Sequence, residues 1–286
     1  MTFDALLQPL ISGILTGMTY VLTALGLTVI FSIMNVLNFA HGEIYMFGAF
    51  CVYFLCGMLH IPYPIGLVAS MVVVGLFGII LERVFFRPAG GDMLTSVIVA
   101  IALIWVFQTG AQLIFGGQPR GMAEVLPGTF TFLGVRISQS RLLAGLISVV
   151  LLAAVYLFVY KTKQGKAIQA LAQDRDAAAL QGVDIDRVGP LGFAIGCALA
   201  GAAGGIMAPI LFVDATMGAS VLGKSLSIIV LGGVGSIPGA ALGGLIIGVA
   251  EAYGQRFVGY PSSTFPFLIM ILVLLFKRTG LMGRQL

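Results

Sequence analysis

KTKQGKAIQALAQDRDAAALQGVDIDR, residues 161–187, is the longest water-compatible stretch in a chain made mostly of apolar runs. Its pattern predicts two very short helices joined as an elbow. The first helix covers residues 166–173, and it places the small or apolar side chains of Ala167, Ala170 and Leu171 on one shared face. This face is narrow and lacks charge, so it is suited to close packing.

The second helix of this elbow is predicted over residues 175–181. Asp174 is placed to act as its N-cap, and Gly182 is placed to end it. A short helical elbow with small side chains suits docking into a cleft of a soluble partner. An ordinary cytoplasmic connector between two membrane helices is the alternative interpretation.

The sequence on either side of the elbow has the composition of an integral membrane protein. The 286 residues are 59% hydrophobic and 9% charged, whereas soluble domains carry about 25% charged residues. A helical span needs about 20 apolar residues, so the chain has room for about eight spans. The apolar runs are continuous, which predicts an all-α, polytopic bundle of transmembrane helices rather than a β-barrel. We expect a single transmembrane domain over residues 1–286.

The apolar runs predict the position of each span. The first run is residues 5–33, and a second span follows from a polar-containing run and its apolar continuation. The remaining runs follow in order along the chain. The predicted spans after the first are 26–58, 65–81, 94–115, 142–160, 191–212, the glycine-rich 225–250 and 265–276.

The glycine-rich run at 225–250 is predicted to be broken. We expect two half-helices that meet at an irregular turn, which is tolerated inside a membrane where protein or a water-filled cavity surrounds it. Small residues elsewhere predict close helix packing. They are the GxxxG pair Gly13 and Gly17, and a stripe of Gly196, Ala200, Gly204 and Ala208. The residues predicted to form the break are Gly233, Gly235, Ser236, Pro238 and Gly239.

Basic residues in the loops predict the orientation of the chain. Five Lys and Arg residues fall in 161–187, two fall in 82–92 and three follow Phe276, so all three segments are expected in the cytoplasm. The connection 116–141, in which residues 129–138 alternate like a small hairpin, is then periplasmic. The C-terminal segment can lie in the cytoplasm only if the glycine-rich region doubles back on itself or contains one further membrane crossing. The net charge of +4 reflects this orientation and does not indicate nucleic-acid binding.

Two short motifs match known phosphate-binding and metal-binding patterns, but the structural elements or further residues that such sites need are missing. Residues 218–225, GASVLGKS, match a phosphate-binding loop, but that loop works between a buried strand and a helix. His41-Gly42-Glu43 contains the HxE of zinc deaminases, but no PCxxC follows. We therefore expect no catalytic residue, metal site or cofactor in this chain. Glu251 is expected at a helix end facing water.

A polar cluster interrupts the second predicted span and needs an explanation, because polar groups inside a membrane are costly. One interpretation is a structural hydrogen-bond cluster that holds a broken helix. The other is a contribution to the substrate path, where polar groups such as Asn38 or His41 would meet the charged ends of a substrate. The candidate residues for this path are Asn35, Asn38, His41, Gly42 and Glu43.

Three segments together resemble a known family. GLTVIFSIMNVLNFAHGEIYMFGAF at 26–50, the segment 165–187 and LGGVGSIPGAALGGLIIG at 231–248 are similar to the permease subunits of branched-chain amino-acid ABC importers, of the LivH type. The resemblance covers nearly the whole chain, and NFAHGE is its most specific part.

The resemblance implies a multi-pass inner-membrane subunit that translocates Leu, Ile or Val by alternating access. It implies four kinds of partner: a second, LivM-type permease subunit, two cytoplasmic ATPases that bind ATP and Mg²⁺, a periplasmic binding protein and the surrounding lipid. It also makes the elbow the region that sits in a groove of the ATPase. The residues assigned to this coupling are Gly165, Lys166, Ala167, Ala170, Asp174, Asp176, Ala177, Ala178 and Gly182.

Two alternatives remain at this stage. A related ABC permease could carry urea, short amides, other amino acids or a sugar, because substrate selection is expected to lie largely in the binding protein. A stand-alone secondary transporter would also have broken, glycine-rich helices, but it is expected to show an internal inverted repeat, and no clear repeat is visible.

Overall fold

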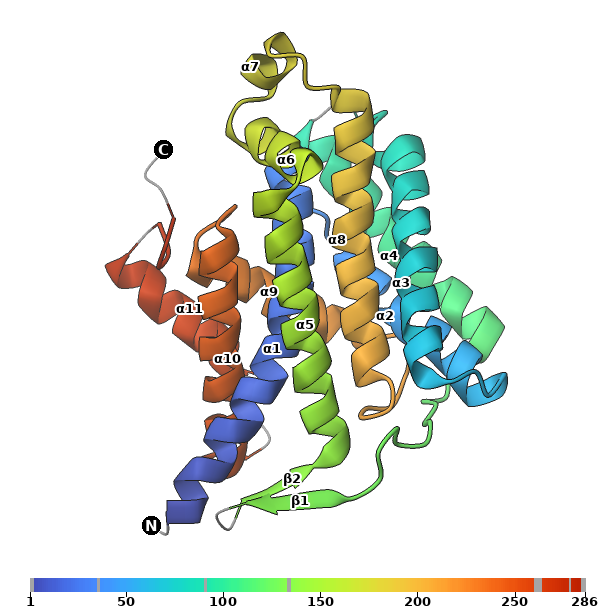
Figure 1. The fold of residues 1–286 in the computed structure, drawn as a ribbon, viewed down its shortest axis with the longest axis vertical. Coiled ribbons are helices and arrows are strands. Elements are labelled where there is room, and N and C mark those ends of the chain that lie inside the picture. Colours follow the sequence, from blue (N-terminus) through green and yellow to red (C-terminus); the bar gives the residue numbers. More distant parts are fainter. Residues whose placement is uncertain are drawn as a thin grey trace.

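The computed structural model describes residues 3–34, 37–89, 92–132, 135–259, 264–277 and 279–283. The α-helices of these ranges form one bundle with a small hairpin at one end (Figure 1). In chain order the helices are α1 (Phe3–Met34), α2 (His41–Val52), α3 (Tyr63–Leu81), α4 (Met93–Phe115), α5 (Gln139–Lys161), α6 (Lys163–Gln173), α7 (Arg175–Leu180), α8 (Ile185–Met207), α9 (Met217–Gly232), α10 (Ile237–Phe257) and α11 (Phe265–Phe276).

Two helices continue as short π-helical segments, α2 over Tyr53–Met58 and α3 over Glu82–Phe86. The strands β1 (Thr129–Phe132) and β2 (Val135–Ser138) pair antiparallel, with Thr129 opposite Ser138. The hairpin predicted over residues 129–138 is therefore confirmed.

Six helices of the described chain are long and apolar enough to cross a membrane: α1, α3 with its π-helical end, α4, α5, α8 and α10. Two shorter apolar helices, α9 and α11, complete the bundle. A polytopic helical membrane protein is thus confirmed. The second span predicted over residues 26–58 is not observed as one helix. Instead, α1 continues to Met34, and a separate, shorter helix begins only at His41.

Small residues set the closest helix contacts, as predicted. On α1, Gly17 faces α10 so closely that a Cβ atom there would lie 2.9 Å from the carbonyl oxygen of Gly244. On α8, Gly196 lies against Gly26 of α1, and Gly204 lies against the backbone of Tyr45 in α2. The stripe on α8 therefore packs against two neighbours at once, which makes α8 a central helix of the bundle.

The glycine-rich region breaks where α9 gives way to α10, but not at the proline. Gly233 and Gly235 both have positive φ, at 104° and 78°, which L side chains rarely adopt. Ser236 then caps α10 by accepting a hydrogen bond from the Gly239 N–H at 3.1 Å. Pro238 lies in the first turn, where its missing N–H is tolerated. The half-helix prediction fits α9, whereas α10 has the length of a full span.

The bundle has two distinct ends (Figure 1). The N-terminal part of α1 lies beside the hairpin, where the Gln8 side chain donates to the Arg136 carbonyl at 2.7 Å. The elbow helices α6 and α7 lie at the other end. The segment after α11 also reaches that other end, because Leu281 N–H donates to Leu231 O at the close of α9. The doubling back that the orientation rule required is present in α9 and α10.

Candidate functional site

The elbow begins with a helix that packs onto its own bundle. Thr162 caps α6 by accepting a hydrogen bond from the Gly165 N–H at 3.0 Å. Gly165 lies so close to the end of α5 that a Cβ atom would collide with the backbone there. Ile168 and Leu171 are buried in one apolar cluster with Ile33, near the end of α1. The apolar face of α6 therefore holds the elbow rigidly on the bundle.

The second helix of the elbow projects away from the bundle. Asp174 caps α7, with its Oδ1 accepting from the N–H groups of Asp176 and Ala177 at 2.9 Å each. Gly182 has φ of +83°, and the helix ends beside it. The N-cap and the terminating glycine predicted from the sequence are both confirmed. Within α7, Ala178 is buried, while its neighbours are exposed.

The structure divides the nine predicted coupling residues into two groups. Four of them face this chain: Gly165, Ala167, Ala170 and Ala178. Five are exposed at the surface: Lys166, Asp174, Asp176, Ala177 and Gly182. Leu180, whose residue surface is 87% exposed at the end of α7, was not among the predicted coupling residues. The sequence signal for it was a single leucine that closes the six-residue helix RDAAAL.

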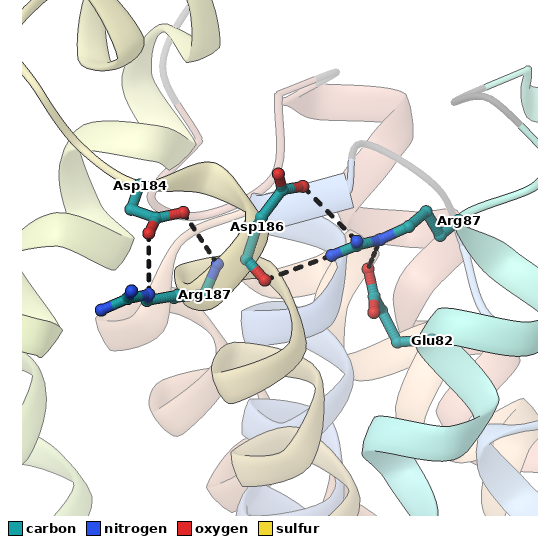
Figure 2. Close-up of polar contacts among 5 residues, drawn as sticks. All are labelled: Glu82, Arg87, Asp184, Asp186 and Arg187. Carbon is teal, nitrogen blue, oxygen red and sulfur yellow. Dashed lines mark hydrogen bonds and ion pairs between the residues drawn. The ribbon is translucent and has the colours of Figure 1, made fainter.

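An ion-pair network ties the far side of the elbow to the bundle (Figure 2). Arg87 lies between two acids: its Nε is 3.3 Å from Glu82 Oε1, and its Nη1 is 3.4 Å from Asp186 Oδ1. Its Nη2 also donates to the Asp186 carbonyl at 3.2 Å. Glu82 follows α3 directly, and Asp186 lies in the first turn of α8. These interactions hold the start of α8, which follows the elbow, next to the end of α3.

The polar cluster of the second predicted span lies where α2 begins. His41 Nε2 is 3.0 Å from the Thr23 carbonyl of α1, and Asn38 Oδ1 accepts from the Ala40 N–H at 3.0 Å. Glu43 Oε1 accepts from the Gln108 side chain of α4 at 2.9 Å. These polar side chains are almost fully buried.

These contacts connect three helices around the start of α2, which favours the structural interpretation. A role in the substrate path stays a prediction. Three polar atoms of the cluster have no hydrogen-bond partner among the described residues: Asn38 Nδ2, His41 Nδ1 and Glu43 Oε2. Asn35, the remaining polar candidate, falls outside the described residues.

Two helices begin inside the bundle rather than at its ends. Gly42, in the first turn of α2, packs directly against Gly218, in the first turn of α9. Both glycines are buried. Paired helix starts of this kind, within a membrane protein, are typical of transporters, where they surround a substrate or ion path. Gly218 opens the GASVLGKS motif, which therefore lies on a packed helix and not on a phosphate-binding loop.

Glu251 does not face water, in contrast to the sequence-based expectation. It lies on α10 with its side chain 8% exposed, and its Oε1 is 2.7 Å from Lys224 Nζ of α9. The hydroxyl of Tyr20 on α1 donates to the other carboxylate oxygen at 2.9 Å. The prediction failed because the partner that stabilises this carboxylate comes from a different helix.

The fold and these sites define a class of protein: a polytopic helical permease with interrupted helices inside and an elbow at one end. Comparison with known proteins agrees. The family model described as "Branched-chain amino acid transport system / permease component" matches residues 10–276. The chain therefore belongs to the family of permease components of branched-chain amino-acid ABC transport systems, and it is a multi-pass protein of the inner membrane.

Individual relatives extend over almost the full chain. The branched-chain amino acid permease protein BraD of Pseudomonas aeruginosa is 35% identical over 97% of this chain and 96% of its own length. LivH of Escherichia coli K12 is 31% identical over the same shares. The probable LivH of Methanocaldococcus jannaschii is 29% identical over 92% of this chain and 88% of its own. No solved structure gave a significant match.

Proposed function

We propose that this chain forms, with a second LivM-type permease subunit, the channel through which Leu, Ile and Val enter the cell by ATP-driven alternating access. Membership of the family supports a transport complex with several subunits. The specific partners are two cytoplasmic ATPases and a periplasmic binding protein. ATP and Mg²⁺ are bound by those ATPases, and this chain needs no cofactor of its own.

The elbow is the single observation that carries this proposal. Residues 161–187 place a short helix, α7, outside the bundle, with Leu180 exposed at its tip. The same elbow is anchored on both sides, through the apolar face of α6 and through Arg87 next to α8. Because α7 projects from the bundle while α6 and Arg87 hold the elbow in place, a movement of a partner bound to α7 is transmitted to the helices of the bundle. This arrangement supports residues 161–187 as the cytoplasmic coupling segment.

The opposite end of the bundle supports a periplasmic role for residues 116–141. This connection carries the hairpin and lies beside the start of α1. The Arg120 and Val213 backbones pair through two hydrogen bonds of 2.8 Å, which tie the loop to the segment between α8 and α9. A binding protein that docked here would contact the segment leading to the interior helix start of α9.

The proposal is tested by purifying the chain in mild detergent from its native host and identifying its partners by mass spectrometry. Recovery of two ATPases and a second permease subunit is expected. Uptake of leucine, isoleucine, valine and urea by the reconstituted complex then identifies the substrate. A chain that purifies alone, and transports without ATP after reconstitution, would instead be a secondary transporter.

A further inference from the structure

A hollow lined by both polar and apolar side chains lies between α1, α5, α8, α9 and α10, and it shares no lining residue with the elbow or with the cluster at the start of α2. Its volume is about 200 Å³. Three hydroxyl side chains of α1 line it at helical spacing, Ser12, Thr16 and Thr19, and Arg141 and Gln255 contribute from α5 and α10. This row of hydroxyl groups gives α1 a polar side facing the hollow.

A charged cluster forms one wall of this hollow. Lys224 and Glu251 are paired at 2.7 Å, with side chains 15% and 8% exposed. Tyr20 joins both: Lys224 Nζ donates to its hydroxyl oxygen at 2.7 Å, and that hydroxyl donates to Glu251. Ionisable side chains at this depth in a membrane protein are costly and usually belong to a functional site.

Thr19 supplies an independent sign that the hollow takes a polar guest. Its hydroxyl oxygen is buried and has no hydrogen-bond partner among the described residues. A serine or threonine within a helix normally satisfies its hydroxyl on the carbonyl one turn earlier, as Thr28 does by donating to Ala24 O at 2.7 Å. Thr19 belongs to the lining of the hollow, and its buried hydroxyl keeps an unused donor and acceptor.

The hollow continues toward the hairpin end of the bundle. A second hollow, of about 320 Å³, shares Ser12, Arg141 and Ile210 with the first. It is lined further by Arg136 and Glu124 of the connection 116–141. Small-molecule sites are typically about 300–1,000 Å³, so the two hollows together have the size of such a site.

We propose that this hollow is a binding subsite for the zwitterionic backbone of an amino acid in transit. The α-carboxylate is held by Lys224 with Arg141, and the α-ammonium is held by Glu251. The hydroxyl of Thr19 completes the hydrogen bonds, and the apolar side chain lies toward Leu15 and Ile210. This inference rests on the proposed function, because it takes an amino acid as the substrate.

A matched pair of charges suits this guest for a physical reason. In the empty site Lys224 and Glu251 neutralise each other, so neither charge is left unpaired within the membrane. A zwitterion brings one charge of each sign, and each partner exchanges one ion pair for another. An anion or a cation alone would leave one side chain unpaired, so the pair discriminates against singly charged molecules.

A purely structural ion pair is the rival explanation, and a double variant separates the two. Breaking a buried pair by removing one charge is strongly destabilising, whereas removing both charges is often neutral. Lys224→Met and Glu251→Gln together should therefore restore the stability that each change loses alone. Only transport distinguishes the explanations, because a structural pair has no further role once the stability is restored.

The experiment uses the complete transport complex reconstituted in liposomes, with leucine uptake and thermal unfolding measured for the native complex and the double variant. We expect native-like unfolding but uptake lowered by about tenfold or more, as for the loss of a charge-assisted hydrogen bond to the substrate. Uptake within about twofold of native, at native stability, would overturn the subsite. A native complex that does not transport branched-chain amino acids would instead contradict the proposed function.

A second measurement decides the case in which the double variant does not assemble. In a background without Cys51, Cys56 and Cys197, Thr16→Cys, at a half-buried position in the lining of the hollow, is exposed to a small cationic thiosulfonate from the hairpin side. We expect modification that saturating leucine slows, while Ala24→Cys, at a fully buried apolar position of α1, stays unmodified. Absence of modification at Thr16→Cys, or modification that leucine leaves unchanged, would overturn the proposal.

Discussion

Gly42 and Gly218 pack backbone against backbone at the point where α2 and α9 begin. A Cβ atom on Gly218 would lie 2.6 Å from the carbonyl oxygen of Gly42, a distance that real Cβ atoms essentially never show. The obstacle is backbone within two buried helices, so no side chain can rotate away. The contact fixes the two interior helix starts relative to each other.

Gly218→Ala should therefore destabilise the protein by about 1–3 kcal/mol, the usual cost of overpacking a close-packed interior. The measurement is thermal unfolding of the purified complex in mild detergent. Gly110→Ala on α4 is the matched control, because no atom of the described residues lies within 4 Å of its added Cβ atom, and alanine is the better helix former. Equal unfolding temperatures for the two variants would show that the helix starts are not held by this contact.

Arg87→Met should lower stability because it leaves Glu82 buried without its ion-pair partner. Loss of a hydrogen bond to a charged group costs about 1.5–3 kcal/mol, and the exposure of Arg87, at 41% of its side chain, places the loss at the lower end. Adding Glu82→Gln should recover most of it, since the unpaired charge is then removed. Thermal unfolding of the single and double variants measures both steps.

The neighbouring pair Asp184–Arg187 offers a control for this network (Figure 2). Its side chains are 51% and 88% exposed, although they are only 2.9 Å apart. Exposed pairs contribute about 0–1 kcal/mol, so Arg187→Met should change the unfolding temperature little. If it destabilised the protein as much as Arg87→Met, burial of Glu82 would not be the cause.

Asp174→Ala should loosen the elbow without affecting the bundle. The carboxylate satisfies two N–H groups at the start of α7, and replacing an N-cap with alanine costs about 1 kcal/mol. Faster amide exchange is expected over residues 175–180, with α8 unchanged. Asp174→Asn keeps a capping oxygen and should behave like the native protein, so exchange rates that rise equally in both variants would exclude capping as the reason.

Features set by local sequence could be predicted. The cap at Asp174, the left-handed Gly182 and the hairpin at 129–138 each depend on residues within a few positions. The membrane spans could also be predicted, because a continuous apolar run of sufficient length can cross a membrane only as a helix. The break at Gly233 was predicted from its glycines, but Pro238 was given too much weight, since the first turn of a helix accepts proline.

Features set by contacts between distant helices could not be predicted. Glu251 was expected at a helix end facing water, whereas it is paired with side chains of other helices. Its partners, Lys224 and Tyr20, are 27 and 231 positions away. The same limit applies to the elbow. The sequence showed a face of small residues, but only the folded structure shows that Ala178 is buried in the cluster with Leu171 while Leu180 is exposed.

Leu180 is a large apolar side chain of the elbow that is highly exposed, and this exposure favours a contact with a partner such as the ATPase. It closes α7, while Ala178 of the same helix is buried against this chain. A substitution at each position should therefore have a different effect. Ala178→Leu overpacks the cluster that holds the elbow, and it should lower the stability of the subunit itself, as measured by thermal unfolding.

Leu180→Asp should leave the isolated subunit stable but weaken its complex with the ATPases. Burying a leucine side chain contributes about 1.5–3 kcal/mol, so ATPase binding and leucine uptake should fall by about tenfold or more. Co-purification in mild detergent and ATP-driven uptake measure the two effects. Leu126→Asp is the control, because Leu126 is 44% exposed in the loop at the opposite end, where ATPase recovery should not change. Native recovery of the ATPases with Leu180→Asp would show that the tip of α7 lies outside the coupling interface.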